Sequence, residues 1–473
     1  NIYIMSTENF SYAVTALLTL GFIFLYSVYR RKYKNYVYMQ KERVTDKLKT
    51  NNPRGKCPPF FPNGWYRLLN SDELNVNEVK YIDYCGREVI VFRAADGKVY
   101  ALHAYCSHMG ANLGIGGKVK GNCIECPFHG WTFDGRTGDC VVSARNTTPK
   151  QVTQFEYNND VKEAVEKDGA YLKKCYDGNV KLKKYLVKEK HGSIMIWYES
   201  REALHEKPYY QPFDLDESRL EYRGESINFV NCHIQEIPEN GADIRHFDFL
   251  HKQLFKGIDF VHFEWTMLSH RATDPDLLVK MKHKHDYIND FKVKKIREFV
   301  TDENKPYVNV ISLDCYLMLF GWRIFFFNAT GFQVGPALVY LFLKAPWYEL
   351  TFAQSITPLD KFMIRVSHKM YASSFLPYCI TAYMLFNEVK QVLNDMDIWN
   401  NKVFGSKLTY NLKTDAGLHS FISFSHSFCL SAFISIFFKF FFIDKNLHEW
   451  RNWYYQFYEG CYEYEKGLDK LNW

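Results

Sequence analysis

The chain has 473 residues, a length that allows two or three domains. Its formal net charge is only +6, and no basic stripe interleaved with aromatic residues is present, so the sequence argues against a nucleic-acid-binding protein. Its twelve cysteines are scattered without a framework, which is typical of proteins in a reducing compartment.

The first element in chain order is an apolar run at residues 10–29, which carries no charge and is long enough to cross a bilayer as a helix. Basic residues follow at once, and the positive-inside rule then places the rest of the chain in the cytosol. A signal peptide is the alternative, but it would have basic residues before the apolar run and a cleavage site after it. We expect a single-pass anchor in residues 1–30 and a basic linker in residues 31–59.

Two short metal-ligand motifs come next. Cys106-Ser-His108 is followed, after seventeen residues, by Cys126-Pro-Phe-His129. Two thiolates and two imidazoles are the ligand set of a Rieske [2Fe–2S] cluster. A zinc site is the alternative, because Cys and His at knuckle spacing often hold zinc. The order favours the cluster, since each motif supplies one thiolate and one imidazole and can therefore bridge both irons.

The surroundings of these motifs, residues 60–175, are expected to form a β-rich domain. Strand-like runs occur at residues 81–91 and 98–103 and are separated by the turn pair Asp96-Gly97. Glycines follow both motifs, and they allow backbone amides to approach the cluster sulfurs. Cys123 and Cys140 flank the site and are expected to serve in packing.

A second constellation is Asp243-Ile-Arg-His246, followed after four residues by His251. The two histidines are expected on a helix, and with one carboxylate they would complete the 2-His-1-carboxylate triad of non-haem Fe(II). Two histidines near an aspartate are more often core or surface residues, and the cluster motif upstream is what favours a metal site here. Asp243 has its own reason to be present, because a ligating histidine usually donates its second N–H to a carboxylate.

The third iron ligand is expected in the segment Asp395-Met-Asp397, at the end of a helical pattern at residues 371–393 within a helical region at 359–400. Of the two carboxylates we favour Asp395, because of the family pattern. The alternative is that both are solvated charges at a helix end. Strands are expected at residues 192–198, 307–320 and 338–343. No glycine fingerprint for a dinucleotide is present, so electrons from NAD(P)H would need a separate reductase.

The quoted residues resemble the Rieske non-haem iron oxygenases and, within them, the Neverland-type cholesterol 7-desaturases. The resemblance covers residues 58–418 and 447–461 and rests on these motifs: FPNGWY at 61–66, AYCSHMGANLGIGG at 104–117, CPFHGW at 126–131, HIQEIPENGADIRHFDFLH at 233–251, QVGPALVYLF at 333–342, DMDIWNNK at 395–402 and WYYQFY at 453–458. It implies an α+β fold: an N-terminal transmembrane helix, the β-rich Rieske domain, and a helix-grip-like catalytic domain in residues 176–473.

The resemblance also implies roles for individual residues. Cys106, His108, Cys126 and His129 would hold the [2Fe–2S] cluster, and His246, His251 and Asp395 would hold the mononuclear iron. Asp243 would bridge His246 to His129 of a neighbouring subunit, because family members typically form trimers. Asn240 is a further tentative site residue. It lies three residues before Asp243, a spacing that resembles the steroid-acting branch, whereas ring-hydroxylating dioxygenases have four.

The activity implied is desaturation of cholesterol to 7-dehydrocholesterol, with O₂ and NAD(P)H as co-substrates, at the cytosolic face of the endoplasmic reticulum. A membrane-tethered enzyme would meet its sterol in the bilayer. A sterol hydroxylase or a side-chain-dealkylating enzyme is the second possibility, and a tethered Rieske electron carrier is a third. Residues 417–446 are rich in Phe, Ser and Ile and interrupt the family pattern. They are either a membrane-dipping element or a retained intron translated in frame, and we favour the intron.

Overall fold

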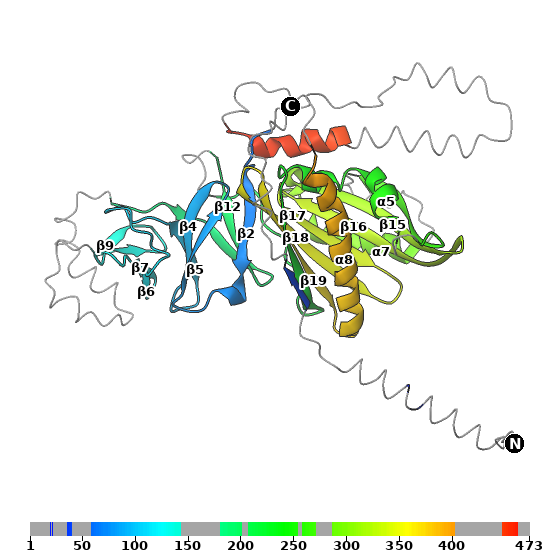
Figure 1. Ribbon diagram of the computed structural model, residues 1–473, viewed down its shortest axis with the longest axis horizontal. Coiled ribbons are helices and arrows are strands. Elements are labelled where there is room, and N and C mark those ends of the chain that lie inside the picture. The colour runs from blue at the N-terminus through cyan, green and yellow to red at the C-terminus, as the bar shows by residue number, and fades with distance from the viewer. Residues whose placement is uncertain are drawn as a thin grey trace, which may run out of the picture.

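The computed structural model of the chain describes residues 19, 21, 36–39, 58–142, 180–200, 207–253, 258–270, 286–402 and 447–461 (Figure 1). Apart from residues 19 and 21, the expected anchor at 10–29 lies outside these residues, and so does the apolar segment 417–446. Within the described part of the chain, no helix is both long enough and apolar enough to cross a membrane.

The N-terminal part of the molecule consists of three small antiparallel sheets. Their orders are β11–β12–β2, β10–β5–β4–β3 and β6–β7–β8–β9. The strands are β2 (Gly64–Asn70), β3 (Val79–Tyr84), β4 (Arg87–Arg93), β5 (Val99–His103), β6 (Lys118–Lys120), β7 (Cys123–Glu125), β8 (Thr132–Asp134), β9 (Cys140–Val142), β10 (Lys184–Tyr185), β11 (Val187–Lys190) and β12 (Ser193–Tyr198). Because β10 pairs with β5 and β12 pairs with β2, these sheets extend to Tyr198, beyond the expected boundary at residue 175.

The single strand expected at residues 81–91 is a hairpin. Strands β3 and β4 pair around a two-residue turn at Cys85 and Gly86, whose φ angles are 48° and 66°. Positive φ at both central residues is the geometry of a type I′ turn, which joins twisted antiparallel strands. Cysteine is an unusual residue at such a position, and for that reason the sequence pattern did not reveal the turn.

The C-terminal part is dominated by one eight-stranded sheet with the order β1–β13–β19–β18–β17–β16–β15–β14. Its strands are β1 (Tyr36–Met39), β13 (Leu220–Val230), β14 (Val261–His270), β15 (Val308–Leu319), β16 (Trp322–Val334), β17 (Leu338–Lys344), β18 (Glu349–Asp360) and β19 (Met363–Ser373). All pairs are antiparallel except β1 with β13. The observed architecture is the expected combination of β-rich and α+β regions.

The helices pack on this sheet. They are α4 (Glu236–Glu239), α5 (Ile244–Leu250), α7 (Asp286–Phe299) and α8 (Tyr378–Trp399), with 3-10 turns at Ser71–Glu73, Lys305–Tyr307 and Tyr455–Tyr458. Helix α8 lies across one face of the sheet, with α5 nearby (Figure 1). It buries an apolar stripe with helical spacing that includes Leu385, Val389, Val392 and Met396. Burial of each such side chain contributes about 1.5–3 kcal/mol.

The helix expected at residues 359–400 is wrong over its first half. Residues Met363–Ser373 form β19, which pairs with β18 on one side and β13 on the other. Pairing on both sides outweighs the local helical pattern, because every backbone group of the segment gains a ladder partner. Helix α8 begins only after Pro377, which is its N-cap residue, and it continues through Asp395 to Trp399.

A short C-terminal helix holds the α4–α5 region in place. Residues 447–454 are helical, and the Arg451 guanidinium pairs with the Glu239 carboxylate at 2.6 Å. The indole of Trp450 donates to Oε1 of Gln333 on β16 at 2.8 Å. Both contacts are buried, so the last described segment fixes α4 against the sheet just before the chain enters α5.

Candidate metal centres

The two cluster motifs form matching loops. In the first loop the amide of Cys106 donates to the carbonyl of Ala111, and the amide of Gly110 donates to the carbonyl of Cys106. In the second loop the amide of Cys126 donates to the carbonyl of Trp131, and the amide of Gly130 donates to the carbonyl of Cys126. Gly110 and Gly130 have φ angles of 71° and 72°, which L side chains rarely adopt. The loops therefore present their ligands in the same way from two sides.

The cysteines lie at the inner end of this site and the histidines at the outer end. Cys106 and Cys126 are buried, whereas His108 is exposed and His129 is half-buried. The two imidazole rings lie 4.8 Å apart, and Trp131 stacks on His108 at 4.6 Å. Trp131, which sequence reasoning did not single out, thus fixes the plane of one imidazole.

The chemistry of these four side chains fits a [2Fe–2S] cluster. Nδ1 of His129 is buried without a hydrogen-bond partner, so a lone pair is free to bind iron. Burial and the neighbouring Cys126 thiol raise the pKa of Cys106 to about 11, so its thiolate needs a metal cation to form at neutral pH. Cys123 is buried, and this burial raises its pKa to about 12. Cys140 packs against the adjacent core, in keeping with the expected packing role.

The spacing of the four ligands argues against a single zinc ion. Ligand atoms around tetrahedral zinc lie roughly 3.6 Å apart, given Zn–S and Zn–N bonds of about 2.3 and 2.1 Å. Within the described ranges, only His246, His251 and Asp395 form a group of three or more ligand atoms that all lie within 4.8 Å of one another. The cluster residues are more widely spread, as two ligands on each of two irons require.

The second centre joins helices α5 and α8. His246 lies in α5, His251 follows its last residue, and Asp395 lies near the end of α8. Their ligand atoms lie within 4.8 Å of one another. Asp395 is buried, whereas Asp397 is exposed, because residues two apart on a helix point in very different directions. The structure thus brings the three expected ligands together and leaves Asp397 outside.

Hydrogen bonds fix the tautomer of each histidine. Nδ1 of His246 contacts the main-chain oxygen of Asp243, and Nδ1 of His251 donates to Oε1 of Gln391 at 2.6 Å. Carbonyl and amide oxygens can only accept, so both Nδ1 atoms carry the proton and both Nε2 atoms present lone pairs. Gln391 was not foreseen from the sequence, although it lies one helical turn before Asp395.

These lone pairs converge on a place for a cation. Nε2 of His251 lies 3.2 Å from Oδ1 of Asp395, and that oxygen accepts no hydrogen bond. Burial disfavours a charged His251, but the adjacent Asp395 carboxylate outweighs it and raises the His251 pKa. For His246 burial dominates and lowers the pKa. One carboxylate and two neutral imidazoles on one point are the donor set of a non-haem Fe(II) site.

Two predicted site residues lie next to this trio. Asn240 ends α4, and its carbonyl accepts the amide of Asp243 at 3.2 Å. Asp243 contacts the His246 imidazole through its main-chain oxygen. The bridge from Asp243 to a neighbouring subunit stays a prediction.

Comparison with known proteins agrees with this donor chemistry. Residues 64–156 match the family model of the Rieske [2Fe-2S] domain. Over 384 residues, 78% of this chain and 70% of the relative, the sequence is 32% identical to a cholesterol 7-desaturase of Hemicentrotus pulcherrimus. A cholesterol 7-desaturase of Xenopus laevis is 32% identical over 78% of this chain and 72% of its own length. One of Ciona intestinalis is 30% identical over 85% and 82%.

The chain belongs to the cholesterol 7-desaturase family of Rieske oxygenases. It is therefore an oxidoreductase with a Rieske [2Fe–2S] cluster and a non-haem iron, which uses O₂ and electrons that derive from a reduced nicotinamide. A probable 3-ketosteroid-9-alpha-monooxygenase of Rhodococcus rhodochrous is a more distant relative, 28% identical over 42% of this chain and 43% of its own.

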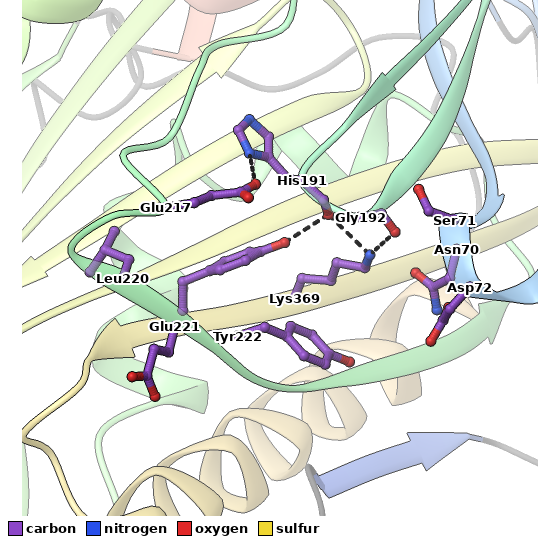
Figure 2. Close-up of a pocket in the computed structure, with 11 residues that line it drawn as sticks. Asn70, Ser71, Asp72, His191, Gly192, Glu217, Leu220, Glu221, Tyr222 and Lys369 are labelled. Atoms are coloured by element: carbon purple, nitrogen blue, oxygen red, sulfur yellow. Dashed lines mark hydrogen bonds and ion pairs between the residues drawn. The ribbon is translucent and has the colours of Figure 1, made fainter. Parts of the chain in front are cut away.

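The cavity in Figure 2 is separate from both centres of this Rieske oxygenase. Its volume is about 460 Å³, and it lies where the β11–β12 turn meets the large sheet. Nζ of Lys369 on β19 donates to the carbonyls of His191 and Gly192, in the β11–β12 turn, at 3.2 and 2.6 Å. The cavity therefore lies at the contact between a small N-terminal sheet and the large sheet. Burial lowers the pKa of Lys369 to about 8.

The length of helix α8 separates this cavity from the iron ligands. Glu221 at the cavity reaches Tyr378, the first residue of α8, at 3.5 Å. Asp395 comes seventeen residues later, which is about 25 Å along a helix. This cavity therefore does not hold the substrate of the iron centre.

Proposed function

We propose that this protein desaturates a sterol between C7 and C8 and so converts cholesterol to 7-dehydrocholesterol. The observation that carries the proposal is an apolar surface beside the iron ligands. Phe247 lies 5.3 Å from the His251 ring and 5.0 Å from Trp265. Both aromatic rings pack with Ile311, Leu341 and Leu343 around a small buried cluster. An unactivated C–H bond of a rigid hydrocarbon needs such surroundings.

The sheet beneath this surface is apolar in two adjacent rows. Strand register aligns Ile311, Gly331, Leu341 and Phe352 in one row, and Leu313, Ala329, Leu343 and Leu350 in the next. Residues two apart on a strand share one face of the sheet, so the rows lie side by side. The residues that β16 contributes to the two rows, Gly331 and Ala329, are small.

When bound, the two metal groups supply single electrons and O₂ activation for the oxidation of a C–H bond. The residues of the chain contribute position. Gln391 and the Asp243 carbonyl hold the two imidazoles, Phe247 and Trp265 exclude water, and the apolar rows orient the rings. Loss of two vicinal hydrogens gives an alkene, whereas oxygen insertion gives an alcohol, and placement over the iron decides between them.

A sterol hydroxylase is the second candidate. It is favoured by the relative named as a probable 3-ketosteroid monooxygenase and by the fact that both outcomes need the same ligands. A side-chain-dealkylating reaction would require the other end of the sterol at the iron. A bare electron carrier does not agree with membership of an oxygenase family whose iron ligands converge here.

We further propose that the active form is a trimer that takes electrons from a separate reductase. The loops that hold the cluster ligands lie near β6 and β7, at the opposite end of the molecule from α5 (Figure 1). Transfer within one chain would run from the small N-terminal sheets to the helices on the large sheet. Met109, Ile115 and Phe128 are exposed around the histidine end of the cluster site, and apolar exposure of this kind suits docking onto a neighbour.

Membrane attachment through residues 10–29, with the body in the cytosol at the endoplasmic reticulum, is part of the same proposal. Its support is the apolar run with its basic flank and the nature of the substrate, because a sterol resides in the bilayer.

The decisive experiment is incubation of the full-length protein in membranes with cholesterol, a reductase and NAD(P)H, with identification of the sterol product. We expect 7-dehydrocholesterol. Asp395→Ala should abolish turnover and leave the cluster spectrum intact, and the matched control Asp397→Ala should retain it. A hydroxylated product would favour the second candidate, and an unchanged sterol with intact cofactors would refute both.

A further inference from the structure

We propose that Glu388 and His368, which face each other between α8 and the sheet, bind the hydroxyl group of the substrate. This inference rests on the proposed function, because it names the part of the sterol that selects its orientation. The two side chains form a buried polar group, unlike the apolar rows beside it, and Glu388 lies on the same helix as the iron ligand Asp395.

The polar group is built from three elements. Ser226 on β13 and His368 on β19 are directly paired in register, so both side chains point to the same face of the sheet. Glu388 projects from α8 onto them. Its Oε2 accepts a hydrogen bond from the Ser226 hydroxyl at 3.2 Å, and its Oε1 contacts Nδ1 of His368.

This group retains hydrogen-bonding capacity. A carboxylate can accept about four hydrogen bonds, and two positions of Glu388 are used by Ser226 and His368. Within the part of the chain that the structure describes, Nε2 of His368 takes part in no hydrogen bond. The side chains are 9% and 17% exposed, so they are neither sealed nor solvated. A hydroxyl both donates and accepts, and it could use both positions.

The position relative to the iron suits a sterol. Glu388, Gln391 and Asp395 are spaced three and four residues apart, so they form one stripe on α8. Glu388 precedes Asp395 by seven residues, which is about 10 Å along the helix axis. Phe247 and Trp265 are apolar and lie near the His251 ring, and Trp265 is on β14, at the opposite edge of the sheet from β13 and β19.

A molecule bound across the iron would therefore meet a polar group at one end and an apolar surface at the other. A sterol has this character, with a hydroxyl on the first ring and an apolar remainder. Its C7–C8 bond belongs to the second ring, which is fused directly to the ring that carries the hydroxyl. If Glu388 and His368 bind the hydroxyl, the second ring is placed toward the iron and the side chain toward Phe247 and Trp265.

The test compares two ligands on the full-length protein in detergent micelles: radiolabelled cholesterol and cholest-5-ene, which lacks only the hydroxyl. We expect the wild-type protein to bind cholesterol at least about tenfold more tightly, as for loss of a hydrogen bond to a charged group. Glu388→Gln and His368→Phe should each weaken cholesterol binding about tenfold and change the Kd for cholest-5-ene less than twofold. Asp397→Asn, an exposed acid on the same helix, is the matched control and should change neither Kd.

A purely structural role for the pair predicts a different result, because both ligands would then lose affinity equally. That outcome would overturn the inference, and so would an unchanged preference for cholesterol in both variants. Binding is measured without turnover, so the two proposals can fail separately. A wild-type protein that binds cholesterol with these ratios but forms no 7,8-unsaturated product would overturn the proposed reaction alone.

Discussion

At the residue scale, the iron site depends on atoms that are not ligands. Each imidazole is held by an oxygen that can only accept, the Asp243 carbonyl for His246 and the Gln391 amide for His251. The two supports differ, because a main-chain oxygen cannot be removed by mutation, whereas a side chain can. Gln391 therefore offers direct access to the orientation of one ligand.

Gln391→Leu should lower the affinity for mononuclear iron about 10–100-fold, as for other lost partners of a metal-binding histidine. Gln391→Glu, which keeps an acceptor, should retain most of it. The measurement is the iron content after dialysis against a graded chelator, together with the EPR spectrum of the nitric oxide adduct. Equal iron retention in both variants would show that Gln391 does not orient His251.

His233 offers a pH test that is independent of the metals. It is fully buried, its Nε2 lies 3.2 Å from the carbonyls of Pro58 and Pro59, and burial lowers its pKa to about 4. The unfolded chain takes up a proton near pH 6.5 and the folded chain does not, so stability falls as the pH drops from about 6.5 to 4.

For the wild-type protein this loss should be on the order of 3 kcal/mol across that range. His233→Gln cannot take up this proton and should flatten the slope between pH 6.5 and 4, whatever it costs at pH 7. Urea unfolding at a series of pH values provides the measurement. A parallel decline in wild type and variant would assign the acid sensitivity to other groups.

At the scale of elements, the cluster site is defined by two loops of the same backbone pattern. Their glycines have open space around the position of a Cβ atom, so their φ angle is what requires glycine. Gly97, in a distant turn, has φ of 83° and equally open surroundings. It therefore provides a control with the same strain and no ligand nearby.

Gly130→Ala and Gly97→Ala should each destabilise the fold by about 1–2 kcal/mol, the cost of the left-handed conformation for a residue with a Cβ atom. Only Gly130→Ala should also lower cluster occupancy, because it moves His129 relative to Cys126. Thermal unfolding and the visible absorbance of the cluster measure the two effects. Equal cluster content in both variants would contradict the role given to this loop.

The longest segment that the sequence predicted wrongly was a helix that is in fact a strand. Residues 363–373 carry a pattern compatible with a helix, yet they form the central strand β19. The strand pairs with its neighbour in the chain, β18 at residues 349–360, and with a distant partner, β13 at residues 220–230. A local pattern cannot report a partner more than a hundred residues distant.

At the scale of the whole molecule, β6 and β7, beside the cluster loops, lie on the far side of the molecule from α5, which carries His246 (Figure 1). Electron transfer over such a length is slow compared with transfer across a subunit contact. The exposed histidine end of the cluster site, with Met109 and Phe128 beside it, is the surface that we expect to meet the iron site of a neighbour.

Mixed oligomers test this arrangement. Cys106→Ser should remove the cluster and His251→Ala the iron, so each variant alone should be inactive. Coexpressed, the two should regain a fraction of wild-type turnover, because a cluster from one chain can serve the iron of the next. The rate of sterol conversion in copurified oligomers, tagged on both chains, is the measurement. No recovery in oligomers that retain both cofactors would indicate transfer within a single chain.

The sequence by itself determined the chemistry. Cys106, His108, Cys126, His129, His246 and His251 stand in short local motifs, and ligand spacing within a loop or a helical turn is set by backbone geometry alone. The family, the cofactors and the β-rich and α+β character could be predicted for the same reason. Asp395 was expected as a ligand only through the resemblance, because it comes 144 positions after His251 in the chain.

Tertiary structure decided what joins distant segments. It brought Gln391 to His251, stacked Trp131 on His108, placed β10 to β12 with the N-terminal sheets, and set Glu388 over His368. Each of these contacts depends on how helices and strands pack, and packing is a property of the whole buried surface rather than of any window of sequence. The metal ligands of this Rieske oxygenase can therefore be identified from its sequence, whereas the groups that orient them and select a substrate can be identified only from its fold.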